Sequence, residues 1–583
     1  MLQRVRPVKR TFKRLGGKKR LYQIYPRSFQ DSDGDGIGDL NGITSRLDYI
    51  QSLGVDIIWL NPIFLSPNDD NGYDISDYRE IMREFGTMED FDRLLKEIHK
   101  REMRLVLDLV VNHTSDEHPW FEEARKSRHN PYYNYYHWWP AEKGEPPLRL
   151  SYFDEEGNAW MYNKSTDSYY LHYFSRKQPD LNWENPEVRQ EIFDMMRFWF
   201  DKGIDGFRMD SISLIAKDPS FPLIDSKKYP DIFSFYAKEP RLHLYLHEMN
   251  RQVLSKYDCM SVGEGSAVMV DDVAKFVDPA REELNMLYHF DAARIRNTTL
   301  PDNPESGIDY SLIALKKMFT EWDKAVDKGW PSIYLGNHDQ PRMVSRFGSD
   351  KDEFRALSAK MLITFLLTMR GTPYWFAGDE IGMRNIRFDR IEDYNDIDTI
   401  NRYKKAKAEG KDPQAVLDEQ KETGRDNART PFQWDRSPET GFTAGTPWLK
   451  VNPDYTWINV ADEEKDPTSI LNYFKKVVSF RKENPSLIYG SYHLLDAENP
   501  QSYTFLRKTG ADTYLIMLNF SPKAAISTPG IDMSNAHVLL DNYGDRSHMA
   551  PQKDITLRPF EAIVFQLNHP VYESFIDSLD LLE

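Results

Sequence analysis

The amino-acid sequence predicts an α/β protein built around a (β/α)8 TIM barrel, with an inserted subdomain after the third strand and a C-terminal antiparallel β-sandwich. Two observations predict the barrel. Short apolar runs alternate with helical patterns along the chain, and several runs lack polar alternation, as strands buried on both faces do. The chain of 583 residues is also long enough for one large barrel with smaller attached units.

The strands of the barrel are expected in sequence order, each followed by a helical pattern. The run Met88–Met103 carries an apolar stripe typical of a helix that packs one face against a sheet. Another helix is expected to begin at Asn185 and Pro186, as N-cap and first-turn proline, and to end at Gly203. The expected strands are Leu21–Tyr25, Val55–Leu60, Arg104–Val111, Ile204–Met209, Met260–Gly263, Met286–Phe290, Ser332–Leu335 and Pro373–Phe376.

The ends of the chain differ from the middle. The first twenty residues contain nine Lys or Arg and no acidic residue. From about residue 490 the pattern becomes all-β, with strands expected at Thr513–Asn519, His537–Asp541 and Ala562–Leu567. The expected parts are a basic arm (1–20), the barrel (21–111 and 184–489), an inserted subdomain rich in Tyr, Trp, His and Pro (112–183), the sandwich (490–568) and an acidic tail (569–583).

Net charge and cysteine content exclude several classes of protein. With 75 basic and 92 acidic side chains, the formal net charge of −17 disfavours binding to nucleic acids or anionic membranes. The single cysteine, Cys259, excludes a disulfide within the chain and a cysteine-based metal site. No apolar run approaches the ~20 residues that span a bilayer, and no secretory signal is recognisable. We expect a cytoplasmic protein, monomeric or weakly oligomeric, that acts on a small molecule.

Charged side chains gather at the expected carboxyl ends of the strands, where barrel enzymes carry their chemistry. Crowded carboxylates raise at least one pKa, which a fold seldom tolerates without a use. Glycoside cleavage requires two carboxyl groups that flank the glycosidic bond, one as the nucleophile and the other as the proton donor. Arg208 shares the strand face of Asp210 and should favour its charged form. The gathered residues are Asp210, Glu264 and Asp339, with His113, Arg208 and His338.

Four segments carry a family resemblance: Asp108–His113 (DLVVNH), Gly206–Asp210 (GFRMD), Val262–Glu264 (VGE) and Asn337–Asp339 (NHD). In this order they resemble the four signature regions of the α-amylase family, glycoside hydrolase family 13. Further strings resemble the branch that holds the oligo-1,6-glucosidases, α-glucosidases and sucrose isomerases; they are Asn61–Ile63, Asn71–Tyr78, Gln178–Trp183 and Gly424–Trp434. The resemblance covers the chain from about Leu21 to the C-terminal sandwich.

The resemblance implies Asp210 as nucleophile, Glu264 as general acid/base and Asp339 as stabiliser of the transition state. It implies a retaining, exo-acting α-glucosidase that hydrolyses terminal α-linked glucose from short oligosaccharides or disaccharides of the isomaltose, maltose or sucrose type. The reaction would pass through a β-glucosyl-enzyme, with some transglycosylation, and Glu264 should have a raised pKa. The residues implied to bind the glucosyl unit are Asp70, Tyr73, His113, Phe153, Phe174, Gln178, Arg208, His338 and Arg425.

Linkage preference stays open at this point, because Ser211 matches neither the Val typical of α-1,6-acting relatives nor the Thr typical of α-1,4-acting ones. A sucrose isomerase that forms isomaltulose or trehalulose is the alternative, since residues 211–222 loosely resemble those enzymes. Against it, Ser266 replaces the phenylalanine that they carry two residues beyond the acid/base, so water should compete better for the glucosyl-enzyme. A non-catalytic transporter heavy chain is a remote alternative, because this chain retains the catalytic acids.

The segment from Asp31 to Asp39, DSDGDGIGD, places oxygen-bearing residues at alternate positions around glycines. This pattern suits a Ca²⁺ ion, although Gly42 stands where an EF-hand loop has its Glu. Relatives in the same branch carry Ca²⁺ in this loop. We expect a structural Ca²⁺ with Asp31, Asp33, Asp35, the Ile37 carbonyl and Asp39 as ligands.

Overall fold

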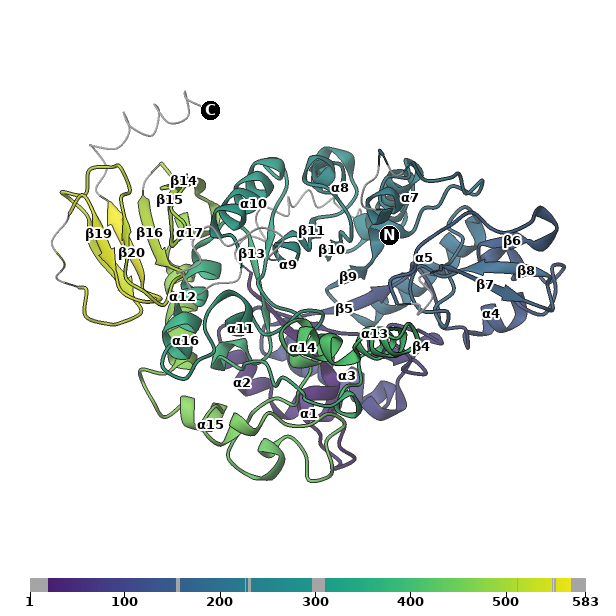
Figure 1. Ribbon diagram of the computed structural model, residues 1–583, viewed down its shortest axis with the longest axis horizontal. Helices are drawn as coiled ribbons and strands as arrows, with labels where there is room; N and C mark the ends of the chain where they lie inside the picture. Colours follow the sequence, from purple (N-terminus) through teal and green to yellow (C-terminus); the bar gives the residue numbers. More distant parts are fainter. Residues whose placement is uncertain are drawn as a thin grey trace, which may run out of the picture.

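The computed structural model describes residues 19–153, 158–225, 227–228, 232–295, 310–510, 512–547, 549 and 552–567. Nearly all of the predicted basic arm and the whole predicted acidic tail lie outside the described residues. Figure 1 shows the barrel in the middle of the molecule, the C-terminal sheets at one end and a small three-stranded sheet at the other. Among the described helices, none is both long and apolar enough to cross a membrane.

An eight-stranded parallel sheet forms the barrel, in the order β11-β10-β9-β5-β2-β1-β13-β12. Its two outer strands meet where the Ser332 hydroxyl donates to the Leu287 carbonyl at 2.5 Å and the Tyr288 and Tyr334 rings stack at 3.9 Å. The predicted (β/α)8 barrel is therefore confirmed. Its strands are β1 (Leu21–Ile24), β2 (Ile57–Leu60), β5 (Arg104–Val110), β9 (Gly206–Asp210), β10 (Met260–Glu264), β11 (Met286–Tyr288), β12 (Ser332–Ile333) and β13 (Thr372–Phe376).

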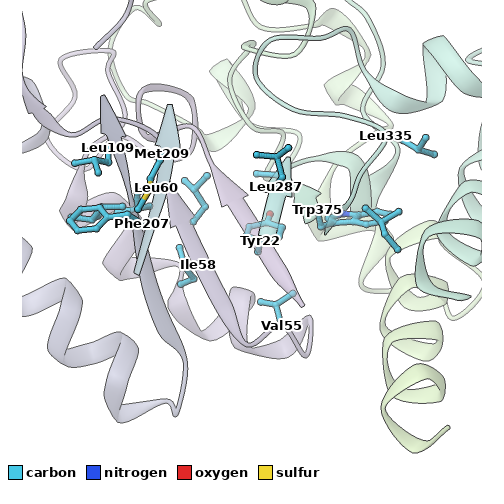
Figure 2. Close-up of a cluster of buried hydrophobic side chains, with 14 of the residues drawn as sticks. Tyr22, Val55, Ile58, Leu60, Leu109, Phe207, Met209, Leu287, Leu335 and Trp375 are labelled. Atoms are coloured by element: carbon cyan, nitrogen blue, oxygen red, sulfur yellow. The ribbon is translucent and has the colours of Figure 1, made fainter. Parts of the chain in front are cut away.

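Alternation along the strands creates two apolar layers. Ile57 and Trp59 of β2 belong to a cluster inside the barrel, together with residues of seven other segments, whereas Ile58 and Leu60 belong to the cluster between the strands and the helices. Figure 2 shows the outer layer, with Phe207 and Met209 of β9 beside Leu60. Because side chains alternate with a period of two, the outward register of a strand also fixes which residues face inward.

Helices cover the outer layer, and their ends follow local capping rules. Helix α3 begins with a capping box in which Thr87 and Asp90 exchange hydrogen bonds. Helix α5 begins after the Asn185 cap and ends at Gly203, whose φ of 109° needs no Cβ. The main helices are α1 (Leu40–Ser45), α2 (Leu47–Ser52), α3 (Met88–Lys100), α5 (Pro186–Lys202), α7 (Arg241–Gln252), α8 (Val273–Val277), α10 (Leu312–Ala325), α12 (Arg355–Thr368) and α16 (Ile470–Glu483).

The segment between β5 and β9 holds a separate small sheet of antiparallel strands, β6 (Trp138–Pro140), β8 (Ser168–Leu171) and β7 (Trp160–Asn163). A short helix, α4 (Pro119–Ala124), precedes it. An antiparallel bridge between His113 and Asp180 returns the chain to the end of β5. The subdomain is thus attached at the carboxyl end of the barrel, where it can form one wall of a site.

After α16 and α17 (Ser486–Tyr489) the chain is all-β. A five-stranded antiparallel sheet has the order β14 (Ser491–Leu495), β15 (Ser502–Lys508), β16 (Thr513–Asn519), β20 (Ala562–Leu567) and β18 (His537–Asp541). The strands β17 (Ala525–Ser527) and β19 (Ile555–Leu557) form a separate pair. Ile555 and Leu557 of β19 belong to an apolar cluster with side chains of β14, β15, β16 and β20. The predicted C-terminal antiparallel unit is confirmed.

Candidate active site

Strand register brings charged residues to the carboxyl end of the barrel interior. In β9, Phe207 and Met209 face the helices, so Arg208 and Asp210 face inward. Val106 of β5 and Val262 of β10 face the barrel interior. Asp108 and Glu264 follow two residues later on the same strands, so they also face inward. The same alternation that fills the lower barrel with apolar side chains therefore places acids at its top.

A cavity of about 290 Å³ opens at this end of the barrel. This volume suits a small ligand rather than a polymer lying in an open groove. The catalytic candidates Asp210, Glu264 and Asp339 all reach it. The other lining residues are Asp70, Tyr73, His113, Tyr152, Phe153, Phe174, Ser211, Ser266, Phe290 and Arg425.

Arg208 lies behind the cavity and balances three carboxylates. Its side chain is fully buried, and Nη1 donates to Asp108 Oδ1 at 2.7 Å and to Asp210 Oδ1 at 2.9 Å. Its Nη2 contacts Glu264 Oε2. One guanidinium thus bridges Asp210 and Glu264, which keeps these two carboxyl groups close together.

Burial raises the pKa of Asp210 to about 7, although the charge of Arg208 lowers it. The neighbouring carboxylates Asp108 and Asp339 add to the rise, because each disfavours another negative charge. Arg208 therefore acts in the expected direction, but burial outweighs it. Asp210 therefore changes its charge near neutral pH.

Asp339 has the opposite electrostatic environment. Burial would raise its pKa, but the charges around it hold the pKa below its usual range. Arg429 Nη2 lies 3.0 Å and Arg425 Nη1 lies 3.3 Å from Asp339 Oδ1. His338 Nε2 lies 3.1 Å from Oδ2, but burial lowers the pKa of that ring well below its usual value, so the positive charge comes from the two arginines. Asp339 is a permanent anion in this site.

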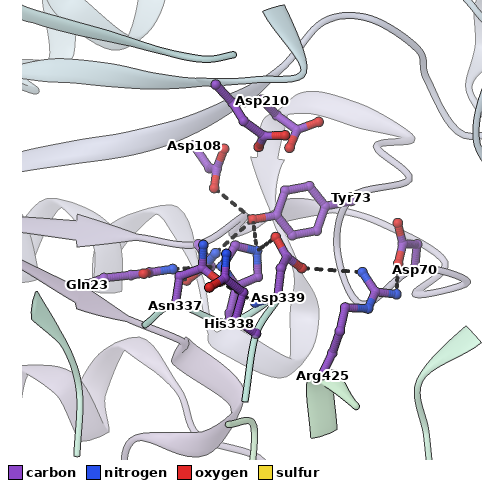
Figure 3. Close-up of polar contacts among 12 residues, drawn as sticks. Gln23, Asp70, Tyr73, Asp108, Asp210, Asn337, His338, Asp339 and Arg425 are labelled. Carbon is purple, nitrogen blue, oxygen red and sulfur yellow. Dashed lines mark hydrogen bonds and ion pairs between the residues drawn. The ribbon is translucent and has the colours of Figure 1, made fainter. Parts of the chain in front are cut away.

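A buried network fixes Tyr73 and His338 (Figure 3). The Tyr73 hydroxyl donates to Asp108 Oδ2 at 2.9 Å and lies 2.6 Å from His338 Nε2. The two rings stack with nearly parallel planes, and their centroids lie 5.4 Å apart. Gln23 Nε2 contacts His338 Nδ1 at 2.8 Å and donates to Asn61 Oδ1 at 2.9 Å. Because Nε2 of the neutral ring faces the Asp339 carboxylate, it carries the proton, and Nδ1 accepts from Gln23.

A polar group of residues forms another part of the cavity wall. Arg425 Nη2 lies 3.4 Å from Asp70 Oδ1, and Gln178 Nε2 donates to Asp70 Oδ2 at 3.1 Å (the first pair is visible in Figure 3). Buried Asp396 holds Arg425 from behind, accepting from Nε at 2.7 Å. Burial lowers the pKa of His113 to about 3, so this ring is a neutral hydrogen-bonding group.

Aromatic rings of the inserted subdomain lie beside this polar group and also line the cavity. Phe174 lies 5.0 Å from the His113 ring and stacks on Tyr152 at 5.0 Å between centroids. Phe153 lies under the Arg425 guanidinium at 4.8 Å. Aromatic rings and carboxylates that line one cavity suit a sugar ring, which has both apolar faces and an equatorial rim of hydroxyls.

Every candidate catalytic residue lines the cavity, and so do all candidate sugar-binding residues except Gln178, Arg208 and His338, which lie directly behind it. The candidates did not include Asp108 or Tyr152. The place of Asp108 could have been predicted, because it lies two residues after the inward-facing Val106 on the same strand. Tyr152 lies in an irregular segment with no such periodicity.

In the loop predicted to hold Ca²⁺, one carboxylate oxygen each of Asp31, Asp33 and Asp39 lies within 4.8 Å of the others. Asp35 is not part of this group. Burial would raise the pKa of Asp31, but hydrogen bonds from Thr443 and from backbone N–H groups lower it overall, so this residue is an anion. Asp39 also accepts from Gly42 N at 2.7 Å and caps α1.

Similarity to known proteins agrees with this geometry. The family model described as the α-amylase catalytic domain matches residues 23–490. The oligo-1,6-glucosidase of Parageobacillus thermoglucosidasius is 51% identical over 94% of this chain and 98% of its own length, and that of Bacillus cereus is 49% identical over the same shares. The crystal structure of a trehalulose synthase variant in complex with Tris superposes with a TM-score of 0.89 at 42% identity, covering 94% of this chain and 99% of that one.

A barrel whose inner carboxylates, arginines and histidines line one small cavity or lie directly behind it is thus matched along nearly its whole length by carbohydrate-active relatives. The chain belongs to the α-amylase family of glycoside hydrolases.

Proposed function

We propose that this protein is a retaining, exo-acting α-glucosidase that hydrolyses terminal α-linked glucose from short oligosaccharides or disaccharides. The observation that carries the proposal is the single guanidinium of Arg208 between Asp210 and Glu264. It holds the two carboxyl groups at a short separation, and a retaining enzyme needs them about 5–5.5 Å apart, without room for a water molecule between carboxylate and sugar.

In the first step, Asp210 attacks the anomeric carbon while Glu264 gives its proton to the departing glycosidic oxygen. A bond from Asp210 to the sugar replaces the glycosidic bond, with β configuration. In the second step, Glu264 takes a proton from water, whose oxygen attacks the same carbon and releases glucose in the α configuration. Asp339, which stays ionised beside Arg425 and Arg429, stabilises the positive charge that develops on the sugar ring.

The pair of Asp70 and Arg425 supports exo-action. Their side chains lie 3.4 Å apart in the wall of the cavity, and we infer that they mark the end of the site beyond a terminal glucosyl unit. Both can bracket the hydroxyls of a terminal glucosyl unit. The neutral rings of His113 and His338 offer hydrogen bonds without adding positive charge that would oppose the transition state.

The α-1,6 linkage is the substrate class we favour, because the oligo-1,6-glucosidases reach 51% identity over nearly the full length. Sucrose isomerisation is the second candidate, supported by the superposition on a trehalulose synthase. Ser266 lines the cavity where that activity would need an aromatic side chain. A smaller side chain admits water to the glucosyl-enzyme, which favours hydrolysis.

A substrate panel tests the proposal. Purified protein is incubated with isomaltose, maltose, sucrose and trehalose, and the products and their anomeric configuration are followed by NMR. We expect α-glucose to appear first, with isomaltose the best substrate. Isomaltulose or trehalulose as the main product from sucrose would favour the second candidate. The matched control Asp210→Asn should keep its thermal unfolding midpoint and lose turnover.

We also propose a structural Ca²⁺ in the loop Asp31–Asp39, with Asp31, Asp33 and Asp39 as carboxylate ligands and Asp35 and the Ile37 carbonyl completing the set. The convergence of three carboxylates supports it, since hard oxygen ligands suit this ion. Ca²⁺ should raise the thermal unfolding midpoint relative to EDTA, as any ligand of the folded state does. Asp33→Asn should abolish this response, because Asp33 is exposed and does not cap α1. An equal response in this variant would contradict the assignment.

A further inference from the structure

The two oxygens of Glu264 have partners of different chemistry. Oε2 contacts Arg208 Nη2, and Oε1 accepts a hydrogen bond of 2.6 Å from Ser266 Oγ. A guanidinium only donates and is always charged, so on its own it favours an ionised Glu264. A serine hydroxyl both donates and accepts, and can therefore face either protonation state of the carboxyl group.

We propose that Ser266 is the positioning residue of the general acid, which directs the transferable proton of Glu264 to Oε1. This inference rests on the proposed α-glucosidase function. A proton on Oε2 would oppose an N–H of Arg208, whereas a proton on Oε1 finds a lone pair of Ser266 Oγ until the glycosidic oxygen of the substrate arrives. Ser266 and Glu264 both line the cavity, and we therefore place Oε1, the oxygen that Ser266 contacts, on the side of the leaving group.

The backbone around Ser266 is anchored on both sides. Its carbonyl accepts from Ser213 Oγ at 2.7 Å, and Ser213 is fully buried three residues after the nucleophile. The preceding residue, Gly265, donates its N–H to the Tyr288 carbonyl at 2.8 Å. A Cβ on Gly265 would lie 2.7 Å from the end of the Leu287 side chain, which would have to shift to admit a larger residue. The loop after the nucleophile thus holds the residue that orients the acid.

The proton transfer is balanced without any further group. The O–H bond of Glu264 breaks as its proton joins the glycosidic oxygen, the bond from that oxygen to the anomeric carbon breaks, and the bond from Asp210 forms. The Ser266 hydroxyl then rotates to donate to the newly ionised Oε1. When water attacks the glucosyl-enzyme, its proton returns to Glu264 and the hydroxyl rotates back.

The test compares Ser266→Ala with the wild type on two substrates. Isomaltose needs proton donation to its leaving group, whereas α-glucosyl fluoride releases fluoride without it. For Ser266→Ala we expect kcat/KM on isomaltose to fall about tenfold or more, as for loss of a hydrogen bond to a charged group. We expect kcat/KM on the fluoride to change less than about twofold, because that step needs no general acid. The alkaline limb of the isomaltose profile should move up, because the hydrogen bond that the hydroxyl gives to the ionised carboxylate is stronger than the one it accepts from the protonated carboxyl group. Ser266→Thr, which keeps the hydroxyl, should restore both values.

Two outcomes would overturn the inference. An equal loss on both substrates with an unmoved alkaline limb would make Ser266 a packing residue. Unchanged kinetics on both substrates would show that Ser266 takes no part in catalysis. A wild-type protein inactive on both substrates would instead refute the proposed function, so the two failures are distinguishable. The thermal unfolding midpoint of each variant shows whether the fold is intact.

Discussion

Replacing Arg208 by Met tests whether one buried cation holds the site together. The side chain is fully buried and contacts Asp108 at 2.7 Å, Asp210 at 2.9 Å and also Glu264. Methionine fills part of the same volume but leaves three carboxylates without their shared counter-charge. Removing one partner of a buried ion pair costs about 3–5 kcal/mol of stability, because the remaining charge is left buried and unpaired.

The sign of the pH dependence follows from linkage. Burial already raises the pKa values of Asp108 and Asp210, and without Arg208 they rise further in the folded state, while in the unfolded state they stay near the usual value of about 4. The folded variant then binds more protons than the unfolded chain, so its stability falls as the pH rises. Each additional unit of pKa costs about 1.4 kcal/mol at high pH. The stability deficit of Arg208→Met should therefore be larger at pH 8 than at pH 5.5.

Thermal unfolding midpoints of the wild type and Arg208→Met, measured at pH 5.5 and pH 8, provide the assay. Adding Asp108→Asn to the variant removes one orphaned charge and should recover part of the deficit at pH 8. Arg208 also lies over the Trp59 ring at 5.1 Å. A deficit that is equal at both pH values and is not relieved by Asp108→Asn would mean that packing on Trp59, not charge balance, is what Arg208 contributes.

Three further predictions concern the site. Since burial raises the pKa of Asp210 to about 7 and only the ionised form attacks, kcat/KM should fall as the pH drops below 7, approaching tenfold per pH unit; a flat profile from pH 5.5 to 7.5 would contradict this. Asp70→Asn weakens the pair with Arg425 and should lower kcat/KM on isomaltose about tenfold, an effect that steady-state kinetics would detect. Gln23→Glu places a carboxylate at Nδ1 of His338 and should raise the pKa of that ring, adding an ionisation to the pH profile that Gln23→Met lacks.

The barrel could be predicted because its strands are short apolar runs with few competing patterns. The runs around Leu21, Ile57 and Arg104 each became a strand within a few residues of the predicted bounds. The run Ser332–Leu335 became a two-residue strand, Ser332–Ile333, because pairing to its neighbour ends where the chain turns toward Asn337. Hydrophobic pattern detects that a segment is buried, but pairing geometry decides where its strand ends.

The acids of the site could be predicted from their positions at strand ends, whereas the balance of their charges could not. Arg208 and Asp210 lie two residues apart, so a shared face follows from the sequence alone. That Arg208 would also reach Asp108 and Glu264, on the two strands flanking β9, depends on the strand order and register of the closed barrel. The pairing of Arg425 with Asp70 spans 355 residues of sequence and has no local signal at all.

The three catalytic candidates differ in charge state. The difference comes from the side chains that contact each of them and not from their positions at the strand ends. Asp339 faces two arginines and remains ionised, while Asp210 shares its one arginine with two other acids and titrates near neutrality. Glu264 has one partner that can only donate and one that can also accept a proton, which is what a group that gives up and recovers a proton requires. Three carboxylates at one rim can thus take three roles, because each is held by a different set of partners.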